Sequence, residues 1–306
     1  MALSEFDLIY RYFSALGRGD AVDLGVGDDC AILRLPPGAR LATSVDTVVE
    51  GVHFPEDAFP EDLAYRAVAV AASDLAAMGA RPLGMTLAIT LPVVDELWLR
   101  AFSEGLAAAV TDFDLPLVGG DTTRGSLCIA VQVFGALPGG KALLRGGAAV
   151  GDSLCVSGTL GDGAAGLAVV SGDWRGDPEQ GDYLERRYYR PTPRLALGLE
   201  LLDTATAAID ISDGLVADAG HIAAASGAKL VIDPQLLPLS PALQALPDRE
   251  QALRWALSGG DDYELCFTLP PGAELPAGCT RIGRVEAGEG VDCGLDLAGP
   301  VGYQHF

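Results

Sequence analysis

The chain has 306 residues, of which 49% are hydrophobic, and it carries 42 acidic side chains against 20 basic ones. A formal net charge of −22 argues against a nucleic-acid-binding protein, because phosphate backbones are bound through basic patches. A chain of this length and apolar content can bury two ordinary cores, and we expect two domains. Its longest apolar runs stop well short of the roughly 18 residues of a membrane span, and residues 1–13 lack a secretory signal.

The six cysteines are far apart in the sequence and show no C-x-x-C spacing. Such a pattern is typical of free thiols in a reducing compartment. We therefore expect a cytoplasmic protein. The cysteines are Cys30, Cys128, Cys155, Cys266, Cys279 and Cys293.

In the first half of the chain, short runs of apolar and β-branched residues bounded by glycine, proline or aspartate predict strands. Helical spacing of apolar residues predicts two helices between them. The strands are expected at 41–46, 83–91, 115–118 and 127–135, and the helices at 62–79 and 95–112. A stretch rich in turn formers follows, and we predict domains at 1–137 and 138–306.

The second half repeats the alternation of strands and helices. Strands are expected at 154–157, 207–211, 264–269 and 281–285, and helices at 161–170 and 213–226. Gly227 fits the C-terminal cap of the last helix. The polar stretch 172–181 is expected to be a loop. Alternating strands and helices favour α/β layers in both halves.

Six acidic motifs, each an aspartate set among glycine, serine or threonine, stand out from this background. They are Gly27-Asp28-Asp29, Ser44-Val45-Asp46, Ser73-Asp74, Gly119 to Thr123, Asp210 to Gly214 and Gly259 to Glu264. Carboxylates without basic partners repel one another when gathered, and an oxygen-only set suits hard divalent ions such as Mg²⁺. The motifs therefore predict a Mg²⁺-dependent phosphate enzyme, although most acidic residues of such a chain simply solvate its surface.

Each motif also has a plainer interpretation. Asp74 lies inside an alanine-rich helix, where aspartate is a poor helix former, so it either reaches a metal ion or faces solvent. The aspartates at strand ends either line a ligand crevice or form turns. Ser212 and Asp213 precede a helix and either cap it or, with its free amides, bind phosphate, as do residues 158–163.

Two other patterns carry little weight. Residues 135–141 spell G-x-x-x-x-G-K, but Ala142 stands where a P-loop needs serine or threonine for Mg²⁺. The three histidines, His53, His221 and His305, are too dispersed for a recognisable zinc site.

Taken in order along nearly the whole chain, these motifs closely resemble the thiamine-monophosphate kinase family. The resemblance rests on 25–31, 46–54, 73–80, 119–125, 212–215 and 258–265. That family belongs to a superfamily with aminoimidazole ribonucleotide synthetase and selenophosphate synthetase. The resemblance implies an α/β (α+β) fold of two domains, an N-terminal sheet that pairs across a homodimer, and a C-terminal mixed sheet with helices.

The resemblance also implies the activity and its residues. ATP would phosphorylate thiamine monophosphate to thiamine diphosphate with several Mg²⁺ ions. The implied metal ligands are Asp29, Ser44, Asp46, Asp74, Asp121, Asp210 and Asp213. Gly120, Asp121, Arg145 and Ser212 would contact ATP, and His53 and Asp261 would contact the substrate. Three positions depart from the family pattern. Family members often have Thr where Val45 stands and Glu where Asp261 stands, and Val301 stands where an aromatic residue packs on the substrate.

The expected reaction is in-line phosphoryl transfer to a phosphate oxygen. That acceptor is already anionic, so no catalytic general base is expected, and catalysis reduces to positioning and charge neutralisation. Two alternatives remain open at this point. One is another ATP-dependent enzyme of the superfamily, a ligase or cyclase or a relative of selenophosphate synthetase, that activates a different acceptor. The other is a non-catalytic protein that binds divalent cations or nucleotides. No membrane or nucleic-acid partner is expected.

Overall fold

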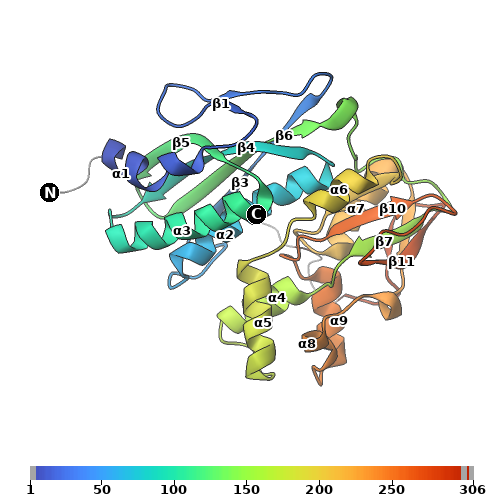
Figure 1. Ribbon diagram of the computed structural model, residues 1–306. Coiled ribbons are helices and arrows are strands. Elements are labelled where there is room, and N and C mark those ends of the chain that lie inside the picture. Colours follow the sequence, from blue (N-terminus) through green and yellow to red (C-terminus); the bar gives the residue numbers. More distant parts are fainter. Residues whose placement is uncertain (1–4, 298–301, 303–306) are drawn as a thin grey trace. The chain divides into compact units, whose positions relative to one another are not determined.

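A computed structural model describes residues 5–297 and residue 302 of the chain (Figure 1). The chain divides into two compact units. The N-terminal unit comprises Met1–Leu75 and Ala80–Lys141, and the C-terminal unit comprises Ala76–Gly79 and Ala142–Phe306.

The N-terminal unit is built on a four-stranded sheet. In spatial order its strands are β3 (Arg40–Val49), β6 (Cys128–Leu137), β4 (Arg81–Leu91) and β5 (Leu117–Arg124). Only the β4–β5 pair is parallel. Because a parallel pair needs a long crossover, α3 (Glu96–Phe113) connects these two strands. Figure 1 shows α3 and α2 (Pro60–Ala77) on the same face of this sheet.

Local sequence signals explain these elements. Along β6 the side chains alternate between buried and partly exposed, and Ile129, Val131 and Val133 are buried. Helix α3 begins where the Asp95 carboxylate accepts hydrogen bonds from the amides of Leu97 and Trp98, which are unpaired in the first turn.

Two small elements complete the N-terminal unit. Helix α1 (Glu5–Tyr12) and the 3-10 turn η1 (Ser14–Leu16) precede a two-stranded ribbon of β1 (Val22–Leu24) and β2 (Ile32–Leu33). The glycine-rich acidic loop that contains Asp29 connects the two strands of this ribbon.

The C-terminal unit contains a six-stranded mixed sheet. In spatial order its strands are β12 (Gly290–Asp292), β9 (Lys229–Ile232), β11 (Cys279–Glu286), β7 (Ser153–Ser157), β10 (Leu265–Leu269) and β8 (Ala207–Asp210). All neighbours are antiparallel except β12 and β9.

Both faces of this sheet are buried. Leu154 and Val156 of β7 belong to one apolar cluster, while Cys155 between them belongs to a second cluster. The alternation follows from the two-residue period of a strand. The helices of the unit are α4 (Asp162–Val170), α5 (Pro178–Tyr189), α6 (Leu195–Leu201), α7 (Leu215–Ser226), α8 (Pro241–Gln244) and α9 (Arg249–Ser258), with the short 3-10 turn η3 (Pro234–Leu236). A further 3-10 turn, η2 (Pro138–Gly140), belongs to the N-terminal unit.

The predicted α/β architecture is confirmed, and the predicted strands and helices all fall on observed ones. The loop predicted at 172–181 is wrong at its end, because α5 already begins at Pro178. Asp177 caps this helix by accepting the Glu179 amide at 2.8 Å, and proline at the first position is a common helix start. Residues 135–141 run from β6 into η2 rather than into an α-helix, as expected of a chance P-loop match. Among the described residues, no helix is both long and apolar enough to cross a membrane.

A close approach of two helices in the N-terminal unit gives a stability prediction. A Cβ on Gly105 of α3 would lie 1.9 Å from the carbonyl oxygen of Glu61 in α2, whereas nothing lies within 4 Å of a Cβ on Gly220 of α7. We expect Gly105→Ala to destabilise the fold by about 1–3 kcal/mol through overpacking. Gly220→Ala, the matched control, should stabilise it by about 0.5–1 kcal/mol. Thermal unfolding followed by circular dichroism measures both; a Gly105→Ala protein as stable as the parent would contradict the packing.

Candidate active site

The first group of predicted ligands lies between β3 and α2. Ser44 of β3 donates a hydrogen bond from its Oγ to the Asp74 carboxylate in the interior of α2. Burial raises the pKa of Asp46, and the negative charge of Asp74 raises it further, to about 6. Asp74 is therefore turned toward two strand residues, and its position in an alanine-rich helix has a structural reason.

This group fits a magnesium ion chemically. A hydroxyl and two carboxylates are an oxygen-only donor set, and Mg²⁺ is usually bound by one or two carboxylates together with substrate phosphates. A cation between Asp46 and Asp74 would relieve the repulsion that raises the Asp46 pKa. Over the described part of the chain, no three His, Cys, Asp or Glu side chains gather closely enough to hold a metal by themselves.

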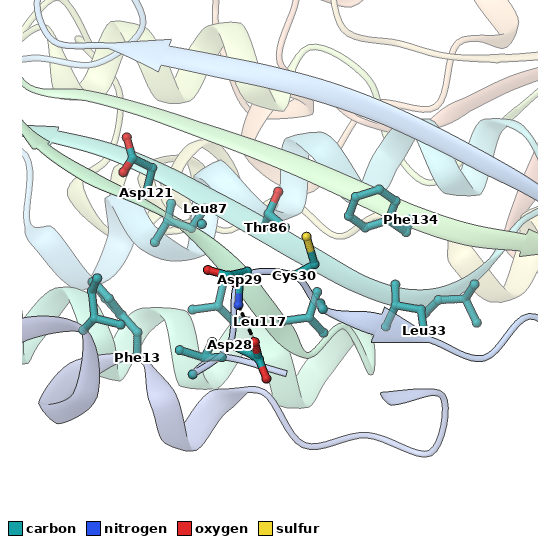
Figure 2. Close-up of a pocket in the computed structure, with 18 of the residues that line it drawn as sticks. Phe13, Asp28, Asp29, Cys30, Leu33, Thr86, Leu87, Leu117, Asp121 and Phe134 are labelled. Carbon is teal, nitrogen blue, oxygen red and sulfur yellow. Dashed lines mark hydrogen bonds between the residues drawn. The ribbon is translucent and has the colours of Figure 1, made fainter. Parts of the chain in front are cut away.

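A second group lines a pocket of about 880 Å³ in the same unit. Figure 2 shows Asp29 on the loop before β2 and Asp121 on β5, both at this pocket, with Thr86 and Phe134 on its wall. Ser44, Asp46 and Asp74 are not among the residues that line it. The N-terminal unit thus brings its five predicted metal ligands together as two groups rather than one.

Gly120 is needed at the wall of this pocket for a steric reason. Its φ is +154°, and a Cβ there would lie 1.9 Å from the Leu87 carbonyl oxygen. Only glycine allows β5 to lie this close to β4 while leaving the backbone of 119–121 facing the pocket. This close approach explains the glycine directly before Asp121.

His53 follows β3 in a tight turn. Its Nδ1 accepts a hydrogen bond from the Val49 amide at 3.0 Å. The neutral ring therefore carries its proton on Nε2, which makes Nε2 a hydrogen-bond donor. A donor of this kind suits an anionic group.

In the C-terminal unit, the predicted ligands Asp210 and Asp213 and the predicted ATP contact Ser212 lie together between β8 and α7. The amides of 212–214 all donate to one oxygen of Asp218, at 3.0, 3.1 and 3.1 Å. Asp218 is only 3% exposed, and burial followed by the charge of Asp213 raises its pKa to about 7. These three amides are therefore bound by a carboxylate of the protein itself rather than open to a phosphate.

The same arrangement recurs at α4. Asp262 accepts the Gly161 amide at 2.7 Å on one oxygen and the Gly163 amide at 2.9 Å on the other. Within 158–163, the amides of Gly161 and Gly163 are therefore bound by the protein itself. The sequence did not mark Asp218 or Asp262 for this role. The partners of Asp262 lie about 100 positions earlier in the chain, and those of Asp218 lie in a loop whose conformation the sequence did not determine.

Arg145 is exposed and lies near the other end of β8. The carbonyl oxygen of the preceding Leu144 accepts the Ala208 amide at 2.9 Å, close to the start of that strand. Ser212 follows four residues after Ala208, a span of about 13 Å in extended chain. The backbones of Arg145 and Ser212 therefore lie near opposite ends of β8.

Asp261 lies beside the Ser212 loop. Its amide donates to the Ser212 carbonyl oxygen at 2.9 Å, and its φ is +68°, in the left-handed region that non-glycine residues avoid. The C-terminal unit thus brings together Asp210, Ser212, Asp213 and Asp261, with Arg145 at a distance.

Of the three departures from the family pattern, Asp261 lies beside the Ser212 loop, as described above, and Val45 can also be placed. Val45 is 61% exposed, whereas Ser44 and Asp46 beside it turn inward, so its side chain points away from Asp74. Val301 lies outside the described residues. A Cβ added to Gly302 would lie 2.7 Å from Cβ of Ala217 and 3.4 Å from the Asp213 carbonyl oxygen, so Gly302 itself lies beside the acidic loop before α7.

Comparison with known proteins agrees with this geometry. The family model described as AIR synthase related protein, N-terminal domain, matches residues 27–137, and the corresponding C-terminal domain model matches 149–295. In fold and in its acidic loops, the chain is an AIR synthase related protein.

The relatives define the family more narrowly. The thiamine-monophosphate kinase of Escherichia coli (strain K12) is 50% identical over 100% of this chain and 99% of its own length. That of Haemophilus influenzae (strain ATCC 51907 / DSM 11121 / KW20 / Rd) is 45% identical over 93% of this chain and 90% of its own. The crystal structure of thiamine-monophosphate kinase from Stenotrophomonas maltophilia K279a superimposes with a TM-score of 0.87 at 43% identity, covering 97% of this chain and 99% of that one. The chain belongs to the thiamine-monophosphate kinase family, and the resemblance seen in the sequence is confirmed.

The position of Val45 predicts that its departure is harmless. Its side chain lies away from the Ser44–Asp46–Asp74 group, so only its backbone is available there. We expect Val45→Thr to leave the turnover number and the KM for ATP within about twofold of the parent, because an exposed strand position tolerates an isosteric change. Steady-state kinetics measures this, with Ser44→Ala as the contrasting variant that loses activity. A large gain on restoring threonine would show that this side chain does take part.

The raised pKa of Asp46 predicts a pH-dependent stability. A carboxyl whose folded pKa is about 6 and whose ordinary value is 3.8 favours the folded state at low pH. This contribution is lost as the pH rises through about 6. In EDTA, the effect on the free energy of unfolding should be on the order of 2 kcal/mol between pH 4 and 7.5.

The test compares melting temperatures of the parent and Asp46→Asn in EDTA at several pH values. Asp46→Asn should be the more stable protein at pH 7.5, with the difference shrinking toward pH 4. Added Mg²⁺ should stabilise the parent at pH 7.5 more than the variant. Parallel pH profiles for the two proteins would contradict this account of Asp46.

Proposed function

We propose that this protein transfers the γ-phosphoryl group of ATP to thiamine monophosphate, giving thiamine diphosphate and ADP. The observation that carries the proposal is the oxygen-only group of Ser44, Asp46 and Asp74, in which two carboxylates repel each other. Membership of the thiamine-monophosphate kinase family supports it. Further support comes from the structure described as AaThiL complexed with AMPPCP and TMP, 34% identical over 100% of this chain and 99% of that one, with a TM-score of 0.82.

We propose Mg²⁺ as the metal. The proposed ligands are Asp29, Ser44, Asp46, Asp74, Asp121, Asp210 and Asp213. Magnesium bound by such oxygens neutralises charge on the phosphoryl groups of ATP. The oxygen-only chemistry of the donors supports this choice over zinc or copper.

The remaining contacts divide between the two substrates. Gly120, Asp121, Arg145 and Ser212 are the proposed ATP contacts, and His53 and Asp261 the proposed contacts to thiamine monophosphate. Arg145 supplies a forked cation for phosphate oxygens in a chain that has few cations. His53 presents its Nε2 donor, because Nδ1 is taken by the Val49 amide.

The chemistry needs little from the protein beyond placement. The acceptor oxygen of a phosphate monoester is anionic at neutral pH, so no side chain has to remove a proton from it. The protein must hold this oxygen in line with the γ-phosphorus and offset the negative charge of both substrates. Direct displacement then forms one P–O bond and breaks another, and ADP leaves.

The cellular setting follows from the same proposal. We propose that the protein acts in the cytoplasm, where ATP is available. Its six cysteines are all unpaired, as in a reducing compartment. We also propose a homodimer with sheet pairing between N-terminal units, which rests on the family resemblance. The proposed domain boundary after residue 137 rests on the stretch of turn formers that follows it.

The proposal predicts the products and the effect of one substitution. Purified protein with ATP, Mg²⁺ and thiamine monophosphate should yield thiamine diphosphate and ADP in equal amounts, measured together by chromatography. Asp74→Asn should lower the turnover number at least about 100-fold at saturating Mg²⁺, because a charge that offsets the metal is lost. Asp182→Asn changes an exposed aspartate of α5 and should retain full activity.

Two outcomes would contradict the proposal. ADP without thiamine diphosphate would move the chain to a different acceptor within the superfamily. Full turnover by Asp74→Asn would remove the argument from the carboxylate pair.

A further inference from the structure

The segment that contains Asp261 has an unusual backbone. Asp261 and Tyr263 have φ values of +68° and +51°. Left-handed conformations are sterically unfavourable for residues with a Cβ, and they persist where the surrounding structure imposes them, often at functional sites. Two such residues within three positions call for an account of what holds them.

Backbone hydrogen bonds fix the segment to the loop before α7. The amide of Asp261 donates to the Ser212 carbonyl oxygen at 2.9 Å, and the amide of Tyr263 donates to that of Ile211 at 2.8 Å. The amide of Ile211 in turn donates to the Glu264 carbonyl oxygen at 2.8 Å. The strained residues therefore move only together with the loop that carries Ser212.

Asp262 anchors the segment on a second side. Its side chain is 2% exposed, and both of its oxygens accept amides at the start of α4. A carboxylate bonded at both oxygens has little rotational freedom.

Glu264 anchors it a third time. Arg194 donates to this buried carboxylate at 2.5 and 2.6 Å, Arg187 donates at 3.1 Å, and the Ser157 hydroxyl donates at 2.5 Å. Forked ion pairs of this kind are among the most directional contacts in proteins. Residues 262 and 264 thus tie the segment to the interior of the unit, from either side of Tyr263.

Between these anchors, Tyr263 and Asp261 contact each other. The phenol hydroxyl of Tyr263 donates to Oδ1 of Asp261 at 3.1 Å, and Tyr263 is only 9% exposed. A tyrosine has two side-chain torsions, and here its backbone is fixed on both sides. Its hydroxyl is therefore a rigid donor that selects one orientation of the Asp261 carboxylate.

We propose that Tyr263 is a positioning residue for thiamine monophosphate, acting by holding the Asp261 carboxylate in its substrate-contacting orientation. The inference rests on the proposed function, since it takes Asp261 as a contact to that substrate. The strained backbone is the cost of placing the two side chains side by side, and the Asp262 and Glu264 anchors sustain it.

The test is the kinetics of Tyr263→Phe, which removes one oxygen atom. The KM for thiamine monophosphate should rise about 5- to 10-fold, the loss expected for one typical net hydrogen bond. The turnover number and the KM for ATP should stay within about twofold. Tyr183→Phe is the matched control, because Tyr183 also donates to an aspartate of this unit, Asp162 at 3.0 Å, and its KM values should be unchanged.

A double-mutant cycle separates positioning from a merely structural role. Asp261→Asn should itself raise the KM for thiamine monophosphate, and adding Tyr263→Phe to it should raise the KM no further. An equal rise in both backgrounds would overturn the proposal, as would an unchanged KM in Tyr263→Phe. A Tyr263→Phe protein that unfolds below the assay temperature would also overturn it, because the role would then be structural.

Crystal structures of the parent and of Tyr263→Phe make the test independent of the reaction. A rotated Asp261 carboxylate in the variant supports the proposal, and an unchanged one overturns it. If the parent protein fails to make thiamine diphosphate, the proposed function falls, and these structures still decide whether Tyr263 orients Asp261.

Discussion

The structure depends on how an acid-rich chain satisfies the carboxylates that it buries. An isolated buried carboxylate is costly unless hydrogen bonds or opposite charges compensate it. Asp218 and Asp262 accept hydrogen bonds from backbone amides, although burial still raises their pKa values to about 7 and about 8, and Glu264 is paired with arginines. Asp46 and Asp74 instead face each other, and burial with their mutual repulsion raises the pKa of Asp46 to about 6. The first three are bound by groups of the protein itself, whereas a repulsion that a cation would relieve remains between the last two.

At two helix starts in the C-terminal unit, backbone amides donate to carboxylates of the protein itself. In many nucleotide-binding folds the free amides at the start of a helix bind phosphate directly. Here the amides before α7 and at α4 bind the protein's own Asp218 and Asp262. At these two loops, carboxylates of the protein itself bind amides that could otherwise contact phosphate, in a chain with 42 acidic side chains and 20 basic ones.

The sequence singled out acidic residues but did not determine what each of them contacts. From the sequence, Asp74 inside a helix was expected either to reach a metal ion or to face solvent. In the structure its carboxylate accepts a hydrogen bond from Ser44. In the Gly259 to Glu264 motif, however, Asp261 and Asp262 look alike. Their roles differ because the backbone turns one toward Ser212 and the other toward α4. The helix that begins at Pro178 was missed, although Asp177 and Pro178 form a recognisable start signal.

By itself, the sequence determined the alternation of strands and helices, the acidic motifs and the family, because periodicity, turn residues and motif order are properties of neighbouring residues. The tertiary structure decided which carboxylates are structural. Asp262 finds Gly161 and Gly163 about 100 positions earlier in the chain, and Glu264 finds Arg187 and Arg194. Burial and hydrogen-bond partners decide whether a carboxylate is satisfied within the protein, and both arise only when distant segments pack together.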